Sequence, residues 1–408
     1  MNRKKKDRNA KILMGIVLFS VLFLFAGNRL ASSHHRDLVI SDYESELGDQ
    51  VFAKVVKIDS VTPNPDDSST NIVKFDAVIT MGDRKGSVVQ AVQHAYKNNE
   101  TMPPAVKAND PVVLGKLSAG ASSEWAFENF DRIGQIAILV LAFILLLFLL
   151  GGRKGLSTVF SLLFTCLSLF CVYIPLIIAG YDIYLLTVVV TVAIIGVSFA
   201  LSGGLNRKSL AAAVGCAGGV VFSGILYRYM ETVMKLTGYY NDQTSRLVQI
   251  FGQNGLDLKA VVFAMVTIGA LGSVMDVAMS IASSLFEIAS ERPAARQEIL
   301  KSGFTIGKDI MGTMANTLIL AYIGSSLVTV LIYGASNYPL FQLLDKEEII
   351  IELLQSLIGV IGMLFTIPFT TVMSSVLFTG RKEEEIPRLV AHKERDGIAR
   401  RDPDQYVK

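Results

Sequence analysis

Charged residues and cysteines are scarce in this chain of 408 residues. Asp, Glu, Lys and Arg make up 18% of it, whereas soluble globular proteins carry about a quarter. The net charge of +2 gives no indication of nucleic acid binding. The few cysteines, Cys166, Cys171 and Cys216, all lie in apolar runs, so they imply no disulfide framework and are interpreted as small packing residues.

The sequence also lacks the common motifs of enzymes. It has no Gly-rich phosphate loop ending in Lys, no His-Glu-x-x-His and no Gly-x-Ser-x-Gly. The Gly-x-Gly-Asp motif of intramembrane aspartyl proteases is missing at Asp276 and Asp309, and Asp182 belongs to an expected surface turn away from Asp276. We therefore expect no enzymatic activity, no cofactor and no bound metal.

Long apolar runs dominate what the sequence does contain. Hydrophobic residues make up 51% of the chain and gather in runs of roughly 20, the length that a helix needs to cross a bilayer. This pattern predicts a mainly α-helical, polytopic membrane protein with about eight spans. The expected spans are residues 12–30, 133–151, 156–179, 183–202, 209–229, 260–288, 310–334 and 349–378.

Basic residues follow every second span, and their placement predicts the topology. A cytoplasmic N-terminus puts all the basic clusters in the cytoplasm, as the positive-inside rule requires. The C-terminus is then cytoplasmic too. The first span is followed by a poor small-residue cleavage site, so we expect an uncleaved signal anchor. The basic clusters are Arg3-Lys4-Lys5-Lys6, Arg153-Lys154, Arg207-Lys208, Arg292/Arg296/Lys301 and Arg381-Lys382.

Residues 32–132 are a different kind of sequence, expected outside the cytoplasm. Apolar and polar residues alternate over 73–81, residues 82–86 read as a turn, and 87–92 read as a returning strand. About five short strands in ~100 residues predict an OB- or SH3-like barrel or sandwich. The predicted domains are a basic N-terminus with its anchor (1–31), this β-rich domain (32–132), a seven-span membrane domain (133–380) and a charged cytoplasmic tail (381–408).

Two consecutive spans carry polar side chains that hydrocarbon normally excludes. At 3.6 residues per turn, each set falls on one face of its helix. No Lys or Arg is expected mid-span, so Asp276 must be protonated, hydrated or bound to a cation. The candidate pathway residues are Asp276, Ser280, Ser283, Ser284 and Glu287 in the first span, and Asp309, Thr313, Asn316 and Thr317 in the second.

The two spans run antiparallel from a cytoplasmic loop, which lets their polar residues be aligned by counting. Glu287 is expected level with Asp309, and Asp276 level with Asn316, forming a polar ladder that reaches mid-membrane. The alternative is structural: hydroxyls and amides can hold membrane helices together by hydrogen bonds of about 0.6 kcal/mol each. The loop itself is expected to contain a short surface helix capped by Gly303.

Small residues are expected where helices approach closely. Gly215 and Gly219 match the GxxxG pattern, and further glycines flank the polar residues. The expected packing positions are Gly215, Gly219, Gly269, Gly272 and Gly312.

The strings GSVMDVAMSIASSLFE (272–287) and SGFTIGKDIMGTMANTLILAYIGSS (302–326) resemble the YibE/YibF-like family of bacterial membrane proteins. The resemblance covers the whole plan of the chain: a basic start, an anchor, an external β-rich region and seven spans. It implies the cell membrane of a Gram-positive bacterium, with the external domain facing the wall. It assigns no activity and no residue roles.

The residues therefore predict a permease-like transporter in which Asp276, with Asn316 and Asp309, forms a cation or proton site. The expected partners are the lipid bilayer and an unknown small solute or ion, with no nucleic acid. The alternative is a non-transporting scaffold or signalling subunit whose external domain binds a protein or a cell-wall component.

Overall fold

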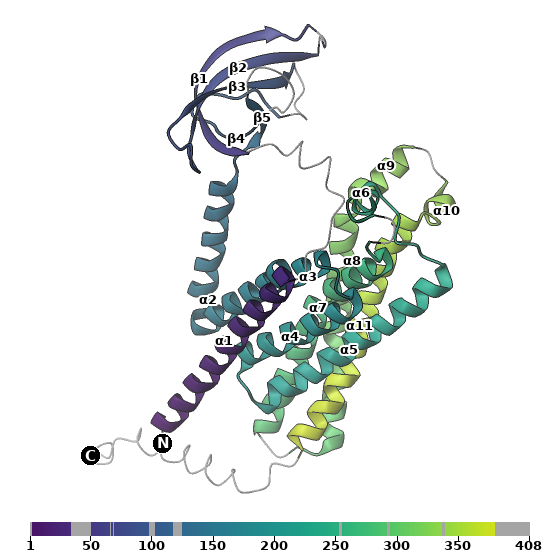
Figure 1. The fold of residues 1–408 in the computed structure, drawn as a ribbon. Coiled ribbons are helices and arrows are strands. Elements are labelled where there is room, and N and C mark those ends of the chain that lie inside the picture. Colours follow the sequence, from purple (N-terminus) through teal and green to yellow (C-terminus); the bar gives the residue numbers. More distant parts are fainter. Residues whose placement is uncertain are drawn as a thin grey trace, which may run out of the picture. The chain divides into compact units, whose positions relative to one another are not determined.

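The computed structural model describes residues 2–33, 50–65, 67, 69–97, 103–116, 125–252, 255–291, 294–336 and 339–379 (Figure 1). The chain divides into two compact units. One contains residues 38–152, and the other contains residues 1–37 together with 153–408. The predicted tail, 381–408, lies outside the described residues.

The β-rich part forms a closed five-stranded barrel. Of the two folds that the sequence predicted, a barrel or a sandwich, the structure therefore has the barrel. Its strand order is β1-β2-β3-β5-β4, and β1 closes it by pairing antiparallel with both β2 and β4. Strands β3 and β5 run parallel. The strands are β1 (Val51–Pro63), β2 (Thr70–Ile79), β3 (Val88–Tyr96), β4 (Pro111–Lys116) and β5 (Trp125–Phe130).

The predicted alternation of strand β2 places one face of it inside the barrel. Val73, Phe75, Ala77 and Ile79 are at most 1% exposed, and the first three pack with Trp125 and other residues of the barrel core. The expected turn after this strand begins and ends at glycines with positive φ, where a side chain would be strained.

The other regular elements among the described residues are helices (Figure 1). Helix α2 is broken at Gly152, whose φ of 52° and ψ of −126° are not helical, so its two parts correspond to the two predicted spans. The helices are α1 (Asn2–Ser33), α2 (Ile133–Leu167), the π-helical turn Ser168–Tyr173, α3 (Ile174–Ile178), α4 (Ile183–Gly203), α5 (Arg207–Met234), α6 (Asp242–Phe251), α7 (Leu258–Glu291), α8 (Arg296–Ser325), α9 (Leu327–Ala335), α10 (Leu340–Leu343) and α11 (Glu347–Phe378).

Seven helices in the described part of the chain are long and apolar enough to cross a membrane. Helices α8 and α9 together form an eighth candidate span, bent by 55°. The apolar helices suggest insertion into a membrane, and their number agrees with the predicted count.

One prediction about the region before α8 is wrong. The chain forms no separate surface helix capped by Gly303, because α8 runs unbroken from Arg296 to Ser325. Gly303 is buried, and a Cβ there would lie 2.5 Å from the Thr371 side chain and 3.0 Å from Leu285. Close packing on its neighbours, which only a small residue permits, keeps this segment helical.

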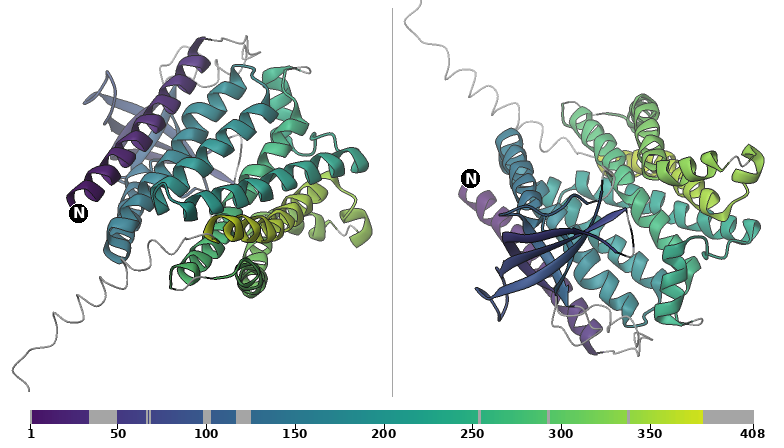
Figure 2. Two further views of the ribbon diagram at one scale, coloured as in Figure 1. Left: turned by 90° about the horizontal axis from the view of Figure 1, so that it is seen from below. Right: turned by 90° about the horizontal axis from the view of Figure 1, so that it is seen from above.

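Helices α5, α7 and α11 form the centre of the helical unit, and α5 lies along α11 (Figure 2). A Cβ on Gly215 would lie 2.7 Å from the Thr370 backbone, and one on Gly219 would lie 2.7 Å from the Gly362 carbonyl oxygen. Both glycines therefore stand where two helix backbones approach closely, as GxxxG patterns favour.

Contacts at the two ends show that α5 and α11 are antiparallel. Arg207 donates to the Leu377 carbonyl at 3.3 Å at one end. At the other end, the Glu347 carboxylate accepts hydrogen bonds of 2.7 Å from the backbone N–H groups of Thr237 and Gly238.

Candidate functional site

The polar residues predicted on the first span form a stripe on α7, here called the α7 stripe: Asp276, Ser280, Ser283, Ser284 and Glu287. Asp276, Ser280 and Glu287 are exposed, and the two middle serines are half-buried. The opposite face of α7 carries apolar residues such as Ile281 and Leu285, which are 0% exposed. The apolar face therefore packs into the core, and the α7 stripe lies on the surface of the helical unit.

The second set forms the α8 stripe: Asp309, Thr313, Asn316 and Thr317. All four residues are exposed. Helix α8 meets its neighbours through Ile299, Gly303 and Gly307 instead, all of which are buried. Both stripes thus belong to surfaces that the described residues leave uncovered.

Two contacts set the register between α7 and α8. Near the loop that joins them, Leu285 lies against Gly303. Toward the other end, a Cβ on Gly269 would lie 2.5 Å from the Tyr322 hydroxyl. Each contact pairs residues at similar distances from the loop, as expected for antiparallel neighbours.

This register places Asp276 on α7 between the levels of Asp309 and Asn316 on α8. Asp276 lies nine residues from Leu285 along α7, and Gly312 lies nine residues from Gly303 along α8. Asp276 and Gly312 are therefore at about the same level. Asp309 and Asn316 therefore lie within about one turn of the Asp276 level, on either side. Glu287 lies about two turns from the level of Asp309, which differs from the predicted pairing because α8 is longer than expected.

The hydroxyl groups of the two stripes bond within their own helices. Ser284 donates to the Ser280 carbonyl at 3.0 Å, and Thr317 donates to the Thr313 carbonyl at 2.9 Å. In the described ranges, no side-chain hydrogen bond or ion pair joins one stripe to the other. The arrangement therefore supplies no direct hydrogen bonding between these two helices through their stripes.

Two lysines fall inside α8 because the helix starts early. Lys301 and Lys308 are exposed, and Lys308 precedes Asp309 directly. Among the residues that the structure describes, neither lysine forms an ion pair with a carboxylate. Successive residues on a helix point about 100° apart, so Lys308 and Asp309 project in different directions.

The glycines next to the stripes divide into two groups. Gly269 lies against Tyr322 and Gln355, and Gly215 and Gly219 lie against α11. Gly272 and Gly312 have nothing within 4 Å of an added Cβ, so they do not stand at the helix contact that the sequence predicted. They leave open space at the level of Asp276 instead.

Three polar residues that the sequence analysis missed lie on α8 and α11, namely Tyr322, Glu352 and Gln355. Tyr322 Oη and Glu352 Oε2 are buried and lack a hydrogen-bond partner in the described part of the chain. Gln355 Nε2 donates to the Met265 carbonyl at 3.3 Å. Glu348, Glu352 and Gln355 recur at helical spacing near the start of an expected span, and that spacing is the signal that could have identified them.

The loop before α6 approaches the same carboxylates. Burial, and then the nearby Glu352 and Glu348 carboxylates, raise the pKa of Tyr240 above its ordinary value. Glu348 itself accepts a hydrogen bond of 3.0 Å from the Tyr333 hydroxyl. Acidic and phenolic groups therefore gather at the end where α11 begins.

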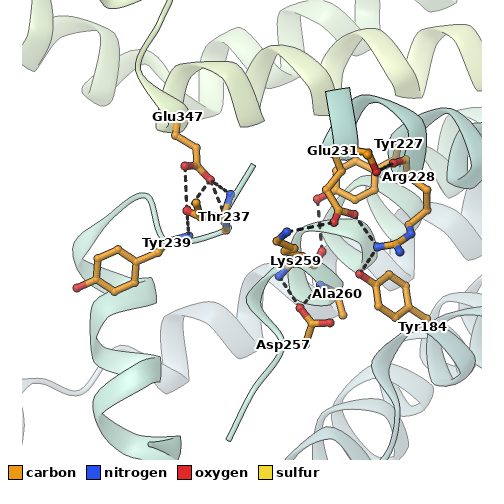
Figure 3. Close-up of polar contacts among 12 residues, drawn as sticks. Tyr184, Tyr227, Arg228, Glu231, Thr237, Tyr239, Asp257, Lys259, Ala260 and Glu347 are labelled. Carbon is orange, nitrogen blue, oxygen red and sulfur yellow. Dashed lines mark hydrogen bonds and ion pairs between the residues drawn. The ribbon is translucent and has the colours of Figure 1, made fainter. Parts of the chain in front are cut away.

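A second polar cluster surrounds a buried carboxylate at the ends of α5 and α7 (Figure 3). Glu231, with a side chain 6% exposed, lies 2.8 Å from Arg228 Nη1 and 3.9 Å from Lys259 Nζ. Arg228 also donates to the Tyr184 hydroxyl at 2.7 Å and lies over its ring, 4.7 Å from the centroid. Asp257 accepts hydrogen bonds from the first backbone N–H groups of α7.

Metal binding finds no support in these clusters. Within the described ranges, no group of three or more His, Cys, Asp or Glu side chains is placed to hold a metal ion. The acidic residues of the two stripes lie singly along their helices.

Comparison with known proteins gives one match. The family model described as YibE/F-like protein matches residues 139–380, which include both stripes and the Arg228–Glu231 cluster. No curated protein and no solved structure matches the chain. The match covers more than half of the chain, so this protein belongs to the YibE/F-like family.

Proposed function

We propose that this protein is a permease-like membrane transporter with an acidic site for a cation or proton at Asp276. The observation that carries the proposal is that Asp276 lies between the levels of Asp309 and Asn316, within about one turn of each, on exposed faces of two adjacent helices. The remaining stripe hydroxyls and Glu287 line the same surface. The solute, or the ion that drives its movement, passes along this surface.

The cost of exposing these groups to lipid supports the proposal. A charged residue at the centre of a membrane helix costs about 2.5–3.5 kcal/mol on insertion scales. Asp276 has no ion-pair partner among the described residues, so water, a proton or a cation must neutralise or solvate it. The space beside Gly272 and Gly312 leaves room for water or an ion at this level.

We propose that the pathway continues from Asp276 toward the end of the helical unit where α11 begins. Tyr322 and Gln355 lie against Gly269, and Glu352 lies one turn before Gln355 on α11, so polar groups continue toward this end below the surface. With both termini in the cytoplasm of a bacterial cell, this end faces outward, on the same side of the cell membrane as residues 32–132. Glu348 and Glu352 then form an outer entrance that attracts cations. We propose that the protein catalyses no covalent reaction.

Cysteine accessibility tests whether water reaches Asp276. In a background with the three native cysteines replaced by alanine, single cysteines are treated with a membrane-impermeant maleimide in cells and in inverted vesicles. A cysteine at Leu163, an exposed apolar position of α2, is the control for a lipid-facing surface. The probed positions are Gly272, Ser280, Ser284 and Thr313.

Labelling of Gly272 and Ser280, with Leu163 unlabelled, supports a hydrated pathway. If all four positions resist labelling from both sides in inserted protein, the surface is dry and the transport proposal fails.

The β-barrel favours the second function, a scaffold or signalling subunit. Its closed order β1-β2-β3-β5-β4, with β3 parallel to β5, is the arrangement we assign to an OB-type barrel, a fold whose faces bind oligosaccharides and oligonucleotides in other proteins. We propose a protein or cell-wall component as its partner. Loss of function on deleting residues 50–130, together with an active Asp276→Asn variant, would favour this function over transport.

A further inference from the structure

The α7 and α8 stripes face away from the core of the helical unit. Asp276 lies nine residues from Leu285, which puts the two side chains on opposite faces of α7, and Leu285 is 0% exposed. Thr313 and Asn316 are likewise exposed on α8. Ionisable residues within membrane helices almost always face other protein segments or a water-filled cavity, because lipid solvates them poorly. The stripes therefore require a cover that the described part of this chain does not provide.

The span of this chain with the least burial is poorly suited to be that cover. The most apolar window of Ile133–Gly152 has no buried residue, and the segment contains no charged and no hydroxyl side chain. Its only polar side chain is that of Gln135. This span therefore cannot neutralise Asp276 or pair with charges on α8.

The uncovered face carries charges of both signs at matching levels. Leu285 lies against Gly303, and Glu287 and Lys301 each lie two residues further toward the loop, so these two charges are level with each other. Two residues turn a helix by about 200°, so both side chains point away from the core. Both are exposed, and neither has an ion-pair partner among the described residues.

A two-fold axis pairs these charges between two copies of the chain. Two copies inserted in the same orientation are related by an axis along the membrane normal, which keeps every residue at its own depth. Glu287 of one copy is then level with Lys301 of the other, and the reverse pair forms as well, because a two-fold interface is self-complementary. A face that complements its own charges in this way favours a second copy over a partner that carries one sign of charge.

We infer that two copies of this chain associate through the α7 and α8 stripes and complete the site at Asp276 between them. Each copy contributes Asp276, Asp309 and Asn316 within about one turn of the same depth, so the interface holds two sets of these groups. The open space beside Gly272 and Gly312 is then enclosed by protein instead of lipid. The enclosed site rests on the proposed transport function, whereas the association of the two copies does not.

Cross-linking between differently tagged copies in native membranes tests the association. In the background without native cysteines, one copy carries Glu287→Cys, the other carries Lys301→Cys, and a short bismaleimide is added. We expect a cross-linked dimer with both tags, because the second ion pair of the interface stays intact. Two copies with Leu210→Cys, an exposed position at the same end of the helical unit on α5, should give no such dimer.

A charge swap tests whether the ion pairs join two chains. Glu287→Lys in one copy and Lys301→Glu in the other leave two attractive pairs in the mixed dimer and two repulsive pairs in each dimer of like copies. After co-expression, we expect the mixed dimer to exceed either dimer of like copies by at least about tenfold. Differently tagged parent copies should pair at random. An ion pair within one chain produces no such preference.

A missing dimer from the Glu287→Cys and Lys301→Cys copies would overturn the inference, and so would equal cross-linking through Leu210→Cys. Random pairing of the charge-swap copies would also overturn it. If the charge-swap copies do not accumulate, the cysteine pair alone decides. The transport proposal fails separately: a dimer whose Gly272 and Ser280 positions resist maleimide keeps the association and loses the pathway, and a monomer that is labelled there does the reverse.

Discussion

Arg228 and Glu231 form an ion pair one turn apart on α5, with 2.8 Å between Nη1 and Oε2. The two partners are unequal, because the arginine is half exposed and the carboxylate is buried. Removing the arginine leaves a buried carboxylate with only Lys259, at 3.9 Å. Removing one partner of such a pair costs more free energy of unfolding than the intact pair contributes, because the remaining charge is left buried and unpaired.

We therefore expect Arg228→Ala to lower the free energy of unfolding by about 2 kcal/mol. Arg228→Ala/Glu231→Gln should recover part of this loss, because no unpaired buried charge remains. Thermal unfolding in detergent measures both. Arg246→Ala on α6, an exposed arginine without an ion pair in the described residues, is the control. A double variant less stable than Arg228→Ala would contradict the argument.

The substitution Asp276→Asn removes the negative charge of this side chain and keeps its size. In vesicles that contain the purified protein, we expect cation or proton flux to fall at least tenfold, because an amide neither binds a proton nor attracts a cation at neutral pH. Elution and unfolding temperature should match the parent protein. Asp242→Asn, at an exposed position in the first turn of α6, should retain full flux. Unchanged flux in Asp276→Asn would remove Asp276 from the pathway.

Gly219 and Gly272 provide a matched pair for the packing between helices. Gly219→Ala forces a Cβ against Thr366 and the Gly362 carbonyl, so it should destabilise the protein by about 1–3 kcal/mol. Gly272→Ala meets nothing within 4 Å and gains helix propensity, so it should be neutral or slightly stabilising. Unfolding temperatures in one detergent compare the two. Equal effects would mean that α5 and α11 are not in close contact.

Glu347 holds the end of α5 to the start of α11 through the backbone N–H groups of Thr237 and Gly238. A hydrogen bond to a charged group contributes about 1.5–3 kcal/mol to stability, so Glu347→Ala should release this loop. We expect faster amide hydrogen exchange at residues 236–241 with little change in the core of α7. Asp345→Ala, an exposed neighbour, is the control and should leave exchange unchanged. Unaltered exchange in Glu347→Ala would show that other contacts hold the loop.

The sequence was sufficient for features that depend on local pattern. Runs of about 20 apolar residues predicted the helices that are long enough to cross a membrane. Alternation over 73–81 predicted a half-buried strand, and the spacing of Asp276 and Ser280 put the α7 stripe on one face. The motif strings also indicated the family that the comparison shows.

Tertiary structure decided the features that depend on distant residues. Gly303 could have ended a helix, but its contact with Thr371 keeps α8 continuous and moves Asp309 away from the level of Glu287. Counting along the sequence could not anticipate this shift. Nor could it show that the polar atoms of Glu352 and Tyr322 are buried. Periodicity determines which face of a helix is polar, whereas the packing of its neighbours determines what that face meets.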